Sequence, residues 1–298
     1  MFLKGNDSRS FLQGQSTCDV RLLSPKCSLH GLLCTPKGRV LTDFLLIDFE
    51  QHGIALRIKK ELAKITNLTL KKYAAFSQVK FSQDLKDWQV AGCWGKEAKD
   101  VIFRILGKKA NGKGSKIHTK NVHAIQIDHA GEHFECIFSP KDDNELLKDF
   151  LETCNEGNEI RWEEELIKLG ISRLDLTSSE EYVPQVLNYD LSDFISFENG
   201  CYTGQEIVAR LKYRGTPKRR SFFASSEKTP GIIPGAPIYF ADTNQIAGVV
   251  INAASSSSKS ISALISISEK AISAELHVCT PNGPKFTLGI LPYEVGFS

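Results

Sequence analysis

The sequence predicts an α+β protein that ends in a small β-barrel or β-sandwich. Between residues 1 and 218, short β-rich runs alternate with segments of helical periodicity. From Arg220 onward, short β-rich runs alternate instead with Pro, Gly and Ser, which is typical of strands joined by tight turns. The length of 298 residues and the hydrophobic fraction of 41% allow more than one core. We expect two interleaved α+β subdomains over residues 1–218 and a barrel over residues 219–298.

The amino-terminal part predicts a helix, a three-stranded meander and a second helix. Asp7 or Ser8 can cap a short helix that Gly14 ends. Three apolar runs separated by turn residues follow, and we expect them to pair antiparallel: Leu29–Cys34, Val40–Phe49 and Ile54–Ile58. Residues 59–72 have apolar residues at helical spacing, so a helix should cover one face of this sheet.

A second set of strands and helices is expected before residue 170. The predicted elements are strands near Phe76–Phe81 and Trp88–Trp94, a helix near Lys96–Leu106, a hairpin of Val122–Ile127 with Phe134–Phe138, a helix opened by Ser139-Pro140, and a helix over Trp162–Leu169. Residues 107–120 are basic and rich in glycine, so we interpret them as a mobile surface loop or, alternatively, a contact for RNA. Residues 172–196 show little periodicity and should form an ordered loop.

The carboxy-terminal region predicts six short strands. They are Ser221–Ala224, Pro237–Phe240, Ile246–Ala253, Ile261–Ile267, Glu275–Cys279 and Lys285–Leu288. The serine run at 255–258 is expected to be a hairpin loop.

The segment Asn199-Gly-Cys-Tyr-Thr-Gly-Gln-Glu206, called the motif segment below, is the strongest candidate for function. Thr203 and Glu206 have the spacing of a capping box, which predicts a helix beginning at Thr203. Cys201 would then lie just before the positive end of a helix dipole, which can lower the pKa of a thiol. A buried packing cysteine is the equal alternative.

Cysteine usage and hydropathy predict a reduced, cytoplasmic chain. The eight cysteines include no CxxC pair and no paired zinc spacing. No segment approaches the roughly 18 apolar residues of a membrane span, and the first residues lack the apolar region of a signal peptide. We therefore expect no disulfide framework, no metal site and no membrane partner.

Several other chemistries receive little support from the residue patterns. Gly107–Lys113 has the spacing of a phosphate loop, but Gly114 replaces the hydroxyl residue that such loops need. The four histidines between 118 and 133 straddle a hairpin and are expected to be exposed rather than to bind metal. A thiol hydrolase would need His30 or His277 to approach Cys201 in space.

A dense cluster of cations follows the motif segment. Six lie within eleven residues: Arg210, Lys212, Arg214, Lys218, Arg219 and Arg220. They could bind a carboxylate or phosphate ligand, or they could form a solvated helix face.

The motif segment resembles the K-G-C-Y-x-G-Q-E signature of the YgfZ family, folate-binding relatives of the glycine-cleavage T-protein. Further segments resemble the family in the family's order: FLQGQSTCDV, TPKGRVLTDF, LKKYAAFSQV, the segment that starts at Trp162, and the terminal LPYE. The resemblance implies a three-domain T-protein-like fold, a central folate pocket and a role in assembling or repairing iron–sulfur enzymes, including those that thiolate tRNA.

Site residues are carried over from this resemblance position by position. Cys201 matches the family's motif cysteine, accompanied by Gly200, Tyr202, Gly204, Gln205 and Glu206. Trp162 matches the indole that lines the folate site, where it could stack on a pterin. Asn199 replaces the family's lysine, and Lys168 stands where T-proteins have a glutamate that reads the pterin. Arg210 and Arg214 are candidates for the folate tail.

Three functional hypotheses follow from the sequence. The first is a tetrahydrofolate-binding accessory protein for iron–sulfur enzymes with Cys201 as its essential thiol, in which any cluster is involved only indirectly. The second is a folate-dependent aminomethyl- or methyltransferase that uses Asp43, for which a solvent-facing structural position is the alternative. The third is a direct tRNA-binding module that uses residues 107–120 and the basic helix.

Overall fold

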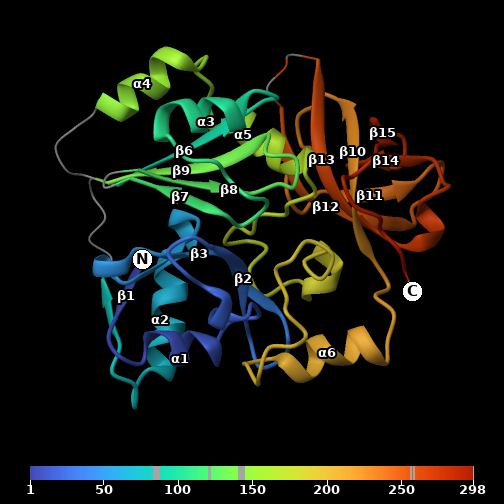
Figure 1. Cartoon of the computed structure of the whole chain (residues 1–298). Coiled ribbons are helices and arrows are strands. Elements are labelled where there is room, and N and C mark those ends of the chain that lie inside the picture. The colour runs from blue at the N-terminus through green and yellow to red at the C-terminus, as the bar shows by residue number, and fades with distance from the viewer. Residues whose placement is uncertain (83–87, 120–121, 140–144, 256, 258, 298) are drawn as a thin grey trace.

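The computed structural model describes residues 1–298 except 83–87, 120–121, 140–144, 256, 258 and 298, and it contains two sheets, a barrel and a central linking segment (Figure 1). The first sheet has the order β2-β3-β4-β1-β5 and is antiparallel throughout. Its strands are β1 (Phe2–Lys4), β2 (Leu29–Cys34), β3 (Val40–Asp48), β4 (Ile54–Arg57) and β5 (Lys80–Ser82). The predicted meander is confirmed by the neighbouring β2, β3 and β4.

Two helices share a core with this first sheet. They are α1 (Ser8–Gln13) and α2 (Ala63–Tyr73), and short 3₁₀ turns lie at Val20–Leu22, Glu50–His52 and Lys60–Leu62. Leu12 of α1 and Leu70 of α2 pack with Phe44 of β3, and all three side chains are buried. The expected helix is present, but Thr66 and Leu70 are its buried residues, whereas Leu68 of the apolar spacing is 60% exposed.

The second sheet has the order β6-β9-β8-β7 and carries two helices on one side (Figure 1). Its elements are β6 (Gln89–Trp94), α3 (Ala98–Leu106), β7 (Lys116–His118), β8 (Val122–Gln126), β9 (His133–Phe138) and α4 (Glu145–Thr153). Ile102 of α3 and Phe150 of α4 pack with Phe134 of β9. The other face of this sheet packs through Ile125 and Ile137 against Leu45 of the first sheet. The expected helix start at Ser139-Pro140 lies partly outside the described residues.

The interpretation of residues 107–120 as a surface loop fits the exposed residues 107–109 and 111 but not the strand that follows them, and residue 120 lies outside the described residues. Lys116 begins strand β7, is buried, and donates a hydrogen bond to the main-chain oxygen of Asp48. Lys113 donates to Ser192 O at 3.0 Å and pairs with Asp193 at 2.9 Å. The basic residues are thus used in part to hold this segment against the rest of the protein.

The carboxy-terminal strands close into a barrel with the order β10-β13-β12-β11-β14-β15. They are β10 (Arg220–Glu227), β11 (Pro237–Phe240), β12 (Ile246–Ala254), β13 (Ser260–Ile267), β14 (Leu276–Val278) and β15 (Lys285–Leu288), with a 3₁₀ turn at Glu269–Ala271. Pairing of β10 with β15 closes the barrel. All six predicted strands are confirmed, because alternating apolar residues and turn residues are local signals.

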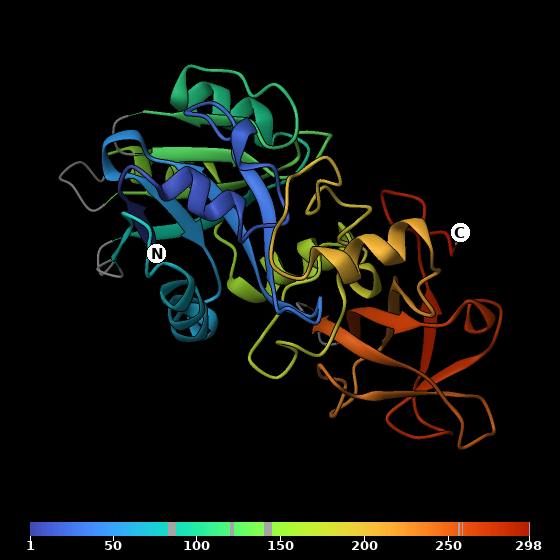
Figure 2. The same cartoon turned by 90° about the horizontal axis from the view of Figure 1, so that it is seen from below.

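A central segment joins the two sheets to the barrel. It contains α5 (Glu159–Lys168), a 3₁₀ turn at Pro184–Leu187 and α6 (Gln205–Tyr213), shown from below in Figure 2. The central core brings together Leu32 of β2, Leu166 of α5, Tyr189 of the segment and Ile251 of β12. The two sheets and the barrel therefore meet around residues 171–198. No helix among the described residues is both long and apolar enough to cross a membrane.

Candidate functional site

The motif segment is anchored against the turn that follows α1. The buried Asn199 amide donates to the main-chain oxygens of Ser16 and Cys18, both at 2.9 Å. Its side-chain oxygen accepts a hydrogen bond from Gln13. Because three hydrogen bonds hold this one side chain, the start of the motif segment has a defined position. Asn199, which replaces the family's lysine, thus works as a structural clamp.

The predicted capping box is wrong, and α6 begins two residues later than expected. Thr203 Oγ1 donates to Gln15 Oε1 at 3.2 Å instead of capping the helix, and the exposed Glu206 pairs with Arg210 at 2.6 Å. Gly204 is the N-cap, with φ of +86° in the left-handed region. A Cβ on Gly204 would lie 2.4 Å from Thr35 O, so this glycine permits the motif segment to touch the Thr35–Gly38 turn.

Cys201 is the exposed member of the eight cysteines, all of which lie in the described part of the chain. Cys18, Cys34, Cys93 and Cys136 are buried, and burial raises the pKa of Cys18 and Cys34 to about 12. Those two thiols are therefore protonated and poor nucleophiles at neutral pH. Of the two interpretations of Cys201, the buried packing cysteine is wrong.

The residues beside Cys201 form the support of the loop. Tyr202 is buried, and burial, followed by the proximity of Cys34, raises the pKa of its hydroxyl. Gln205 Nε2 donates to Asn199 O at 3.4 Å. Gly200 has no neighbour that an added Cβ would meet within 4 Å, so the backbone next to Cys201 is open to solvent. Neither His30 nor His277 contacts Cys201: His30 packs against Phe194, whereas His277 bonds within the barrel.

Asp43 belongs to a buried cluster of opposite charges at the centre of the molecule. Its Oδ2 lies 2.7 Å from Arg173 Nε, and its Oδ1 accepts from Leu174 N at 3.0 Å. Arg173 Nη1 is 3.7 Å from Glu135 Oε1, whose other oxygen is 3.0 Å from Arg57 Nε. Asp43 is 1% exposed, so the solvent-facing position that we considered for it is wrong.

Arg173 connects this cluster to all three parts of the fold. Asp43 comes from the first sheet and Glu135 from the second. The Asn252 amide of barrel strand β12 bonds both main-chain groups of Arg173, at 3.1 Å and 2.7 Å. Burial alone would lower the pKa of Arg173, but Asp43 and Glu135 outweigh it and raise the pKa. The guanidinium is therefore permanently charged.

Three buried nitrogens of this region have no hydrogen-bond partner within the described residues. They are Arg173 Nε, which still forms an ion pair with Asp43, Arg173 Nη2 and His30 Nε2, and both side chains are more than nine-tenths buried. Burial, then the charges of Lys113, Arg173 and Arg57, keep the pKa of His30 well below its usual value, so its imidazole is neutral. A buried donor without a partner is costly, so these two groups mark a place where a polar ligand or water would be stabilised.

Trp162 lies on α5 and is packed rather than open. Its ring covers Gly92 of β6, where an added Cβ would lie 2.3 Å from the indole. The Trp94 ring is 5.7 Å away and the His133 ring 6.4 Å away, measured between centroids. Lys168, near the end of the same helix, is half-exposed and pairs with Glu165 at 2.8 Å.

Arg210 and Arg214 lie on or next to α6, at the bottom of Figure 1, whereas α5 with Trp162 and Lys168 lies in the upper half. Both arginines are exposed, and Arg210 pairs with Glu206. Arg220, the last cation of the cluster, is buried and holds Asp190 through two hydrogen bonds. The folate candidates proposed from the sequence are thus divided between two regions.

Comparisons with known proteins identify relatives of this chain. Over 232 residues the chain is 34% identical to the tRNA-modifying protein YgfZ of Photobacterium profundum, and the match covers 76% of the chain and 67% of that relative. The chain belongs to the YgfZ family. The tRNA-modifying protein YgfZ of Aliivibrio fischeri is also 34% identical, over 76% of the chain and 69% of its own length. No family model matches the chain.

A solved structure gives the same fold for this YgfZ-family chain. The aminomethyltransferase T of the glycine cleavage system from Bartonella henselae matches with a TM-score of 0.70, covering 97% of the chain and 82% of that structure. Its sequence identity is 16%, so the likeness shows the fold alone. The expected T-protein-like architecture with a carboxy-terminal barrel is confirmed.

Sequence reasoning missed three residues of the buried cluster in this YgfZ-family protein, Arg57, Glu135 and Arg173. It considered the neighbouring His30 only as a partner of Cys201. One signal was present for Glu135, because a single carboxylate inside an apolar strand run requires a buried partner. Arg57, near the end of an apolar run, carries the same signal. Nothing local identifies Arg173 or His30, since their surroundings come from distant parts of the chain.

Other candidate sites contain less chemistry. Two of the hairpin histidines, His123 and His133, are buried, contrary to expectation, and His118 stacks on His123 with centroids 5.5 Å apart. Across the described residues, no group of three or more His, Cys, Asp or Glu is arranged to hold a metal ion.

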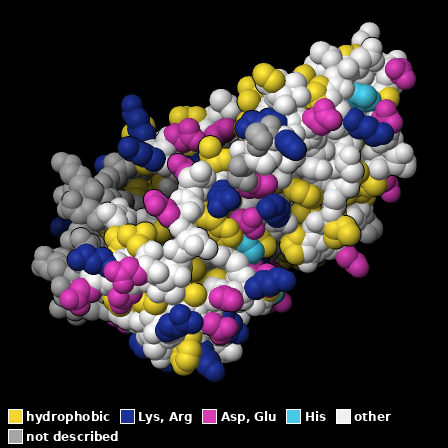
Figure 3. All heavy atoms as spheres, turned by 90° about the horizontal axis from the view of Figure 1, so that it is seen from above, with side chains coloured by type: hydrophobic (Ala, Val, Ile, Leu, Met, Phe, Trp, Pro, Cys, Tyr) yellow, Lys and Arg dark blue, Asp and Glu magenta, His cyan; other side chains and the backbone are white. Residues whose placement is uncertain are grey.

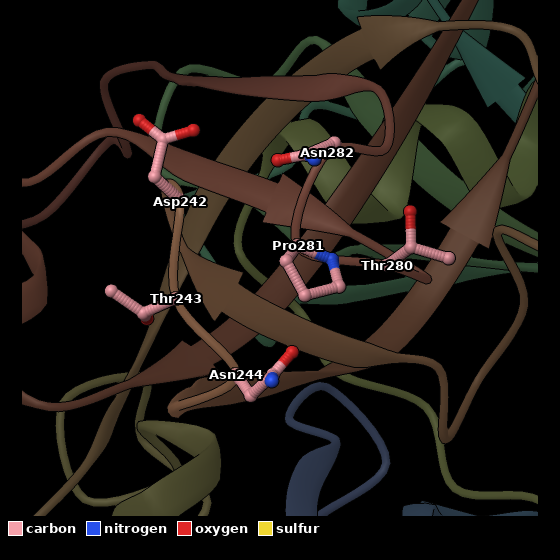
Figure 4. A pocket seen from close by; sticks show the side chains of 6 residues that line it. All are labelled: Asp242, Thr243, Asn244, Thr280, Pro281 and Asn282. Atoms are coloured by element: carbon pink, nitrogen blue, oxygen red, sulfur yellow. The ribbon is translucent and has the colours of Figure 1, made fainter.

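A polar hollow of about 370 Å³ lies between two barrel loops and is lined by Asp242, Thr243, Asn244, Thr280, Pro281 and Asn282 (Figure 4).

Proposed function

We propose that this YgfZ-family protein binds a folate and supports the assembly or repair of iron–sulfur enzymes, including tRNA-modifying ones, through the thiol of Cys201. One observation carries the proposal: a fixed loop presents an exposed cysteine while the other thiols are at least partly covered. A positioned, accessible thiol can exchange with thiols or ligate iron transiently. The relatives are named tRNA-modifying proteins, which supports the choice of client enzymes.

The folate part rests on the central cluster and on Trp162. A folate carries a hydrogen-bonding pterin ring and a glutamate tail with carboxylates, and guanidinium groups pair well with carboxylates. Arg173 Nη2 and His30 Nε2 supply groups that still need partners. The Trp162 indole would contact the aromatic rings of folate once the partly buried Trp94 moves aside. The exposed Arg210 and Arg214, on and next to α6, are not part of this folate site.

The transferase alternative receives no support from the position of Asp43. Asp43 is 1% exposed, and its two oxygens contact Arg173 and Leu174 N. A general base must come within hydrogen-bond reach of its substrate, and this carboxylate is enclosed by protein groups. We therefore propose a single function.

Folate binding is tested by calorimetry with tetrahydrofolate and with folinic acid. We expect Trp162→Leu to weaken binding about tenfold or more, because stacking on an indole is lost. Trp88→Leu is the matched control, since Trp88 packs with Phe2 and Phe49 instead. The folate assignment is abandoned if wild-type protein shows no heat of binding at millimolar ligand, or if both variants bind as wild type does.

The role of Cys201 is tested in a bacterial strain that lacks its own YgfZ. Cys201→Ala should fail to restore the activity of iron–sulfur enzymes that thiolate tRNA, measured as thiolated nucleosides in total tRNA. Cys279→Ala, which removes a partly exposed barrel cysteine, should restore it as wild type does. Full restoration by the Cys201 variant would exclude an essential thiol.

A further inference from the structure

The α6 segment has a charge distribution that neither folate binding nor thiol chemistry uses. Residues 207–219 contain five Lys or Arg and no Asp or Glu. Arg210 pairs with Glu206, whereas Lys212, Arg214 and Lys218 are exposed and form no ion pair with any described carboxylate. Exposed cations of one sign create a positive potential that attracts polyanions.

Tertiary contacts place these cations beside the Cys201 loop. The Lys212 ammonium lies 5.0 Å from the ring centroid of Phe197, and the Tyr213 ring is 6.2 Å from the same ring. Phe197 precedes Cys201 by four positions, so the carboxyl end of α6 packs against the start of the motif segment. At the other end of α6, Gly38 packs against Ile207. The exposed Lys37, which precedes Gly38, therefore lies close to the start of α6.

We define the α6 basic face by six residues: Lys37, Arg210, Lys212, Tyr213, Arg214 and Lys218. Tyr213 is 69% exposed and is the large hydrophobic residue exposed on this face. Figure 3 shows the molecule from above, whereas α6 lies at the bottom of Figure 1. On the face in Figure 3, Lys and Arg are intermixed with Asp and Glu. Glu206, which pairs with Arg210, is the exposed carboxylate of α6, so the excess of cations lies at the carboxyl end of the helix and in the residues that follow it.

Several cations around one exposed aromatic ring fit single-stranded nucleic acid. Lys and Arg neutralise successive phosphates, and an aromatic ring stacks on an unpaired base. A membrane surface would require several exposed apolar side chains, whereas this face offers one ring. An acidic protein would need the cations but would leave the ring without a specific partner.

We propose that the α6 basic face binds a looped or single-stranded segment of RNA, with its phosphates on the cations and a base stacked on Tyr213. Bound there, the RNA lies next to the Cys201 loop. The proposal does not depend on folate binding or on the reaction of the thiol, so RNA binding and folate binding can fail separately.

The test measures fluorescence anisotropy of a labelled single-stranded RNA of about 12 nucleotides and of unfractionated tRNA at roughly 50–200 mM KCl, without folate. We expect the triple variant Lys212→Gln/Arg214→Gln/Lys218→Gln to weaken binding at least tenfold. The slope of log K, where K is the binding constant, against the logarithm of the salt concentration is negative. Its magnitude should decrease by about 2, because each phosphate that is no longer neutralised by a cation reduces it by roughly 0.7. Tyr213→Leu should weaken binding about tenfold with an unchanged salt slope, because stacking is not ionic.

The matched control removes three cations from the barrel. Lys228→Gln/Lys259→Gln/Lys270→Gln changes the net charge equally, and these lysines are also exposed and outside any described ion pair. Binding should change less than twofold. Equal losses in the two triple variants, no RNA binding at the lowest salt concentration, or tighter binding to polyglutamate or to anionic vesicles than to RNA would overturn the proposal.

Discussion

Gly204 shows at the residue scale why the motif segment has its particular sequence. Its φ of +86° lies in the left-handed region, and its missing side chain lets the backbone approach Thr35 O. With Asn199 clamped under α1 at one end and Gly204 against the Thr35–Gly38 turn at the other, the loop between them has little freedom. Cys201 is therefore exposed on a loop that is held at both ends.

We predict that Gly204→Ala destabilises the protein and that Gly200→Ala does not. A left-handed conformation costs a non-glycine residue about 1–2 kcal/mol, and the contact of the new Cβ with Thr35 O adds to this cost. Gly200 lies in the same loop with nothing within 4 Å of an added Cβ. Urea denaturation measures both free energies of unfolding. Equal stability of the two variants would mean that Gly204 does not constrain the loop.

At the element scale, His133 joins the second sheet to α5. It lies at the start of β9, with Nδ1 at 3.2 Å from Asp128 Oδ2 and Nε2 at 3.3 Å from Glu165 Oε2 of α5. Burial alone would lower the pKa of His133, but hydrogen bonds to Asp128 and Glu165 outweigh burial and raise the pKa to about 9. The same interactions, mainly the bond from His133, lower the pKa of Glu165 to about 2.

This ion cluster predicts a specific pH dependence of stability. The folded pKa of His133 exceeds its usual 6.5, so its contribution is complete below pH 6.5 and is lost as the pH rises to about 9. We expect His133→Gln to cost about 2–3 kcal/mol near pH 6 and much less above about pH 9. Urea denaturation of wild type and variant at both pH values tests this. A difference that stays constant with pH would contradict it.

At the scale of the whole molecule, Arg173 is the point where the three parts meet. Its side chain pairs with carboxylates of both sheets, and its main chain bonds Asn252 of the barrel. The pairing is buried, so removing one partner leaves an uncompensated charge in a medium of low dielectric constant. Unfolding of one part is thereby coupled to the others.

We predict that Arg173→Met lowers the free energy of unfolding by about 3–5 kcal/mol. The double variant Arg173→Met/Asp43→Asn should lose less than the sum of the two single losses, because the pair is removed together. Arg21→Met is the matched control. The Arg21 side chain is 66% exposed in its pair with Asp19, so this substitution should change the free energy of unfolding far less than Arg173→Met does. Additive losses in the double variant would show that Arg173 and Asp43 do not interact.

The sequence alone determined the family and much of the secondary structure of this protein. Strands β2, β3 and β4 and the barrel strands were found to within a few residues, because alternation and turn residues are local. Strand β1 was not predicted, and β5 begins four residues later than expected. Helix α6 was misplaced at its start, since the capping pattern of Thr203 and Glu206 is overridden by contacts with Gln15 and with the turn at Thr35. Local patterns cannot include such partners.

Tertiary structure decided how these residues are used. Asp43 and the backbone of Leu174 are 131 positions apart, so only the fold brings Arg173 between the two sheets and the barrel. The exposure of Cys201 likewise depends on the distant residues Gln13, Ser16 and Cys18, which hold Asn199. The burial of a side chain and its charge partners depend on neighbours that are remote in sequence. For that physical reason the sequence predicts the helices and strands, whereas the fold determines the site.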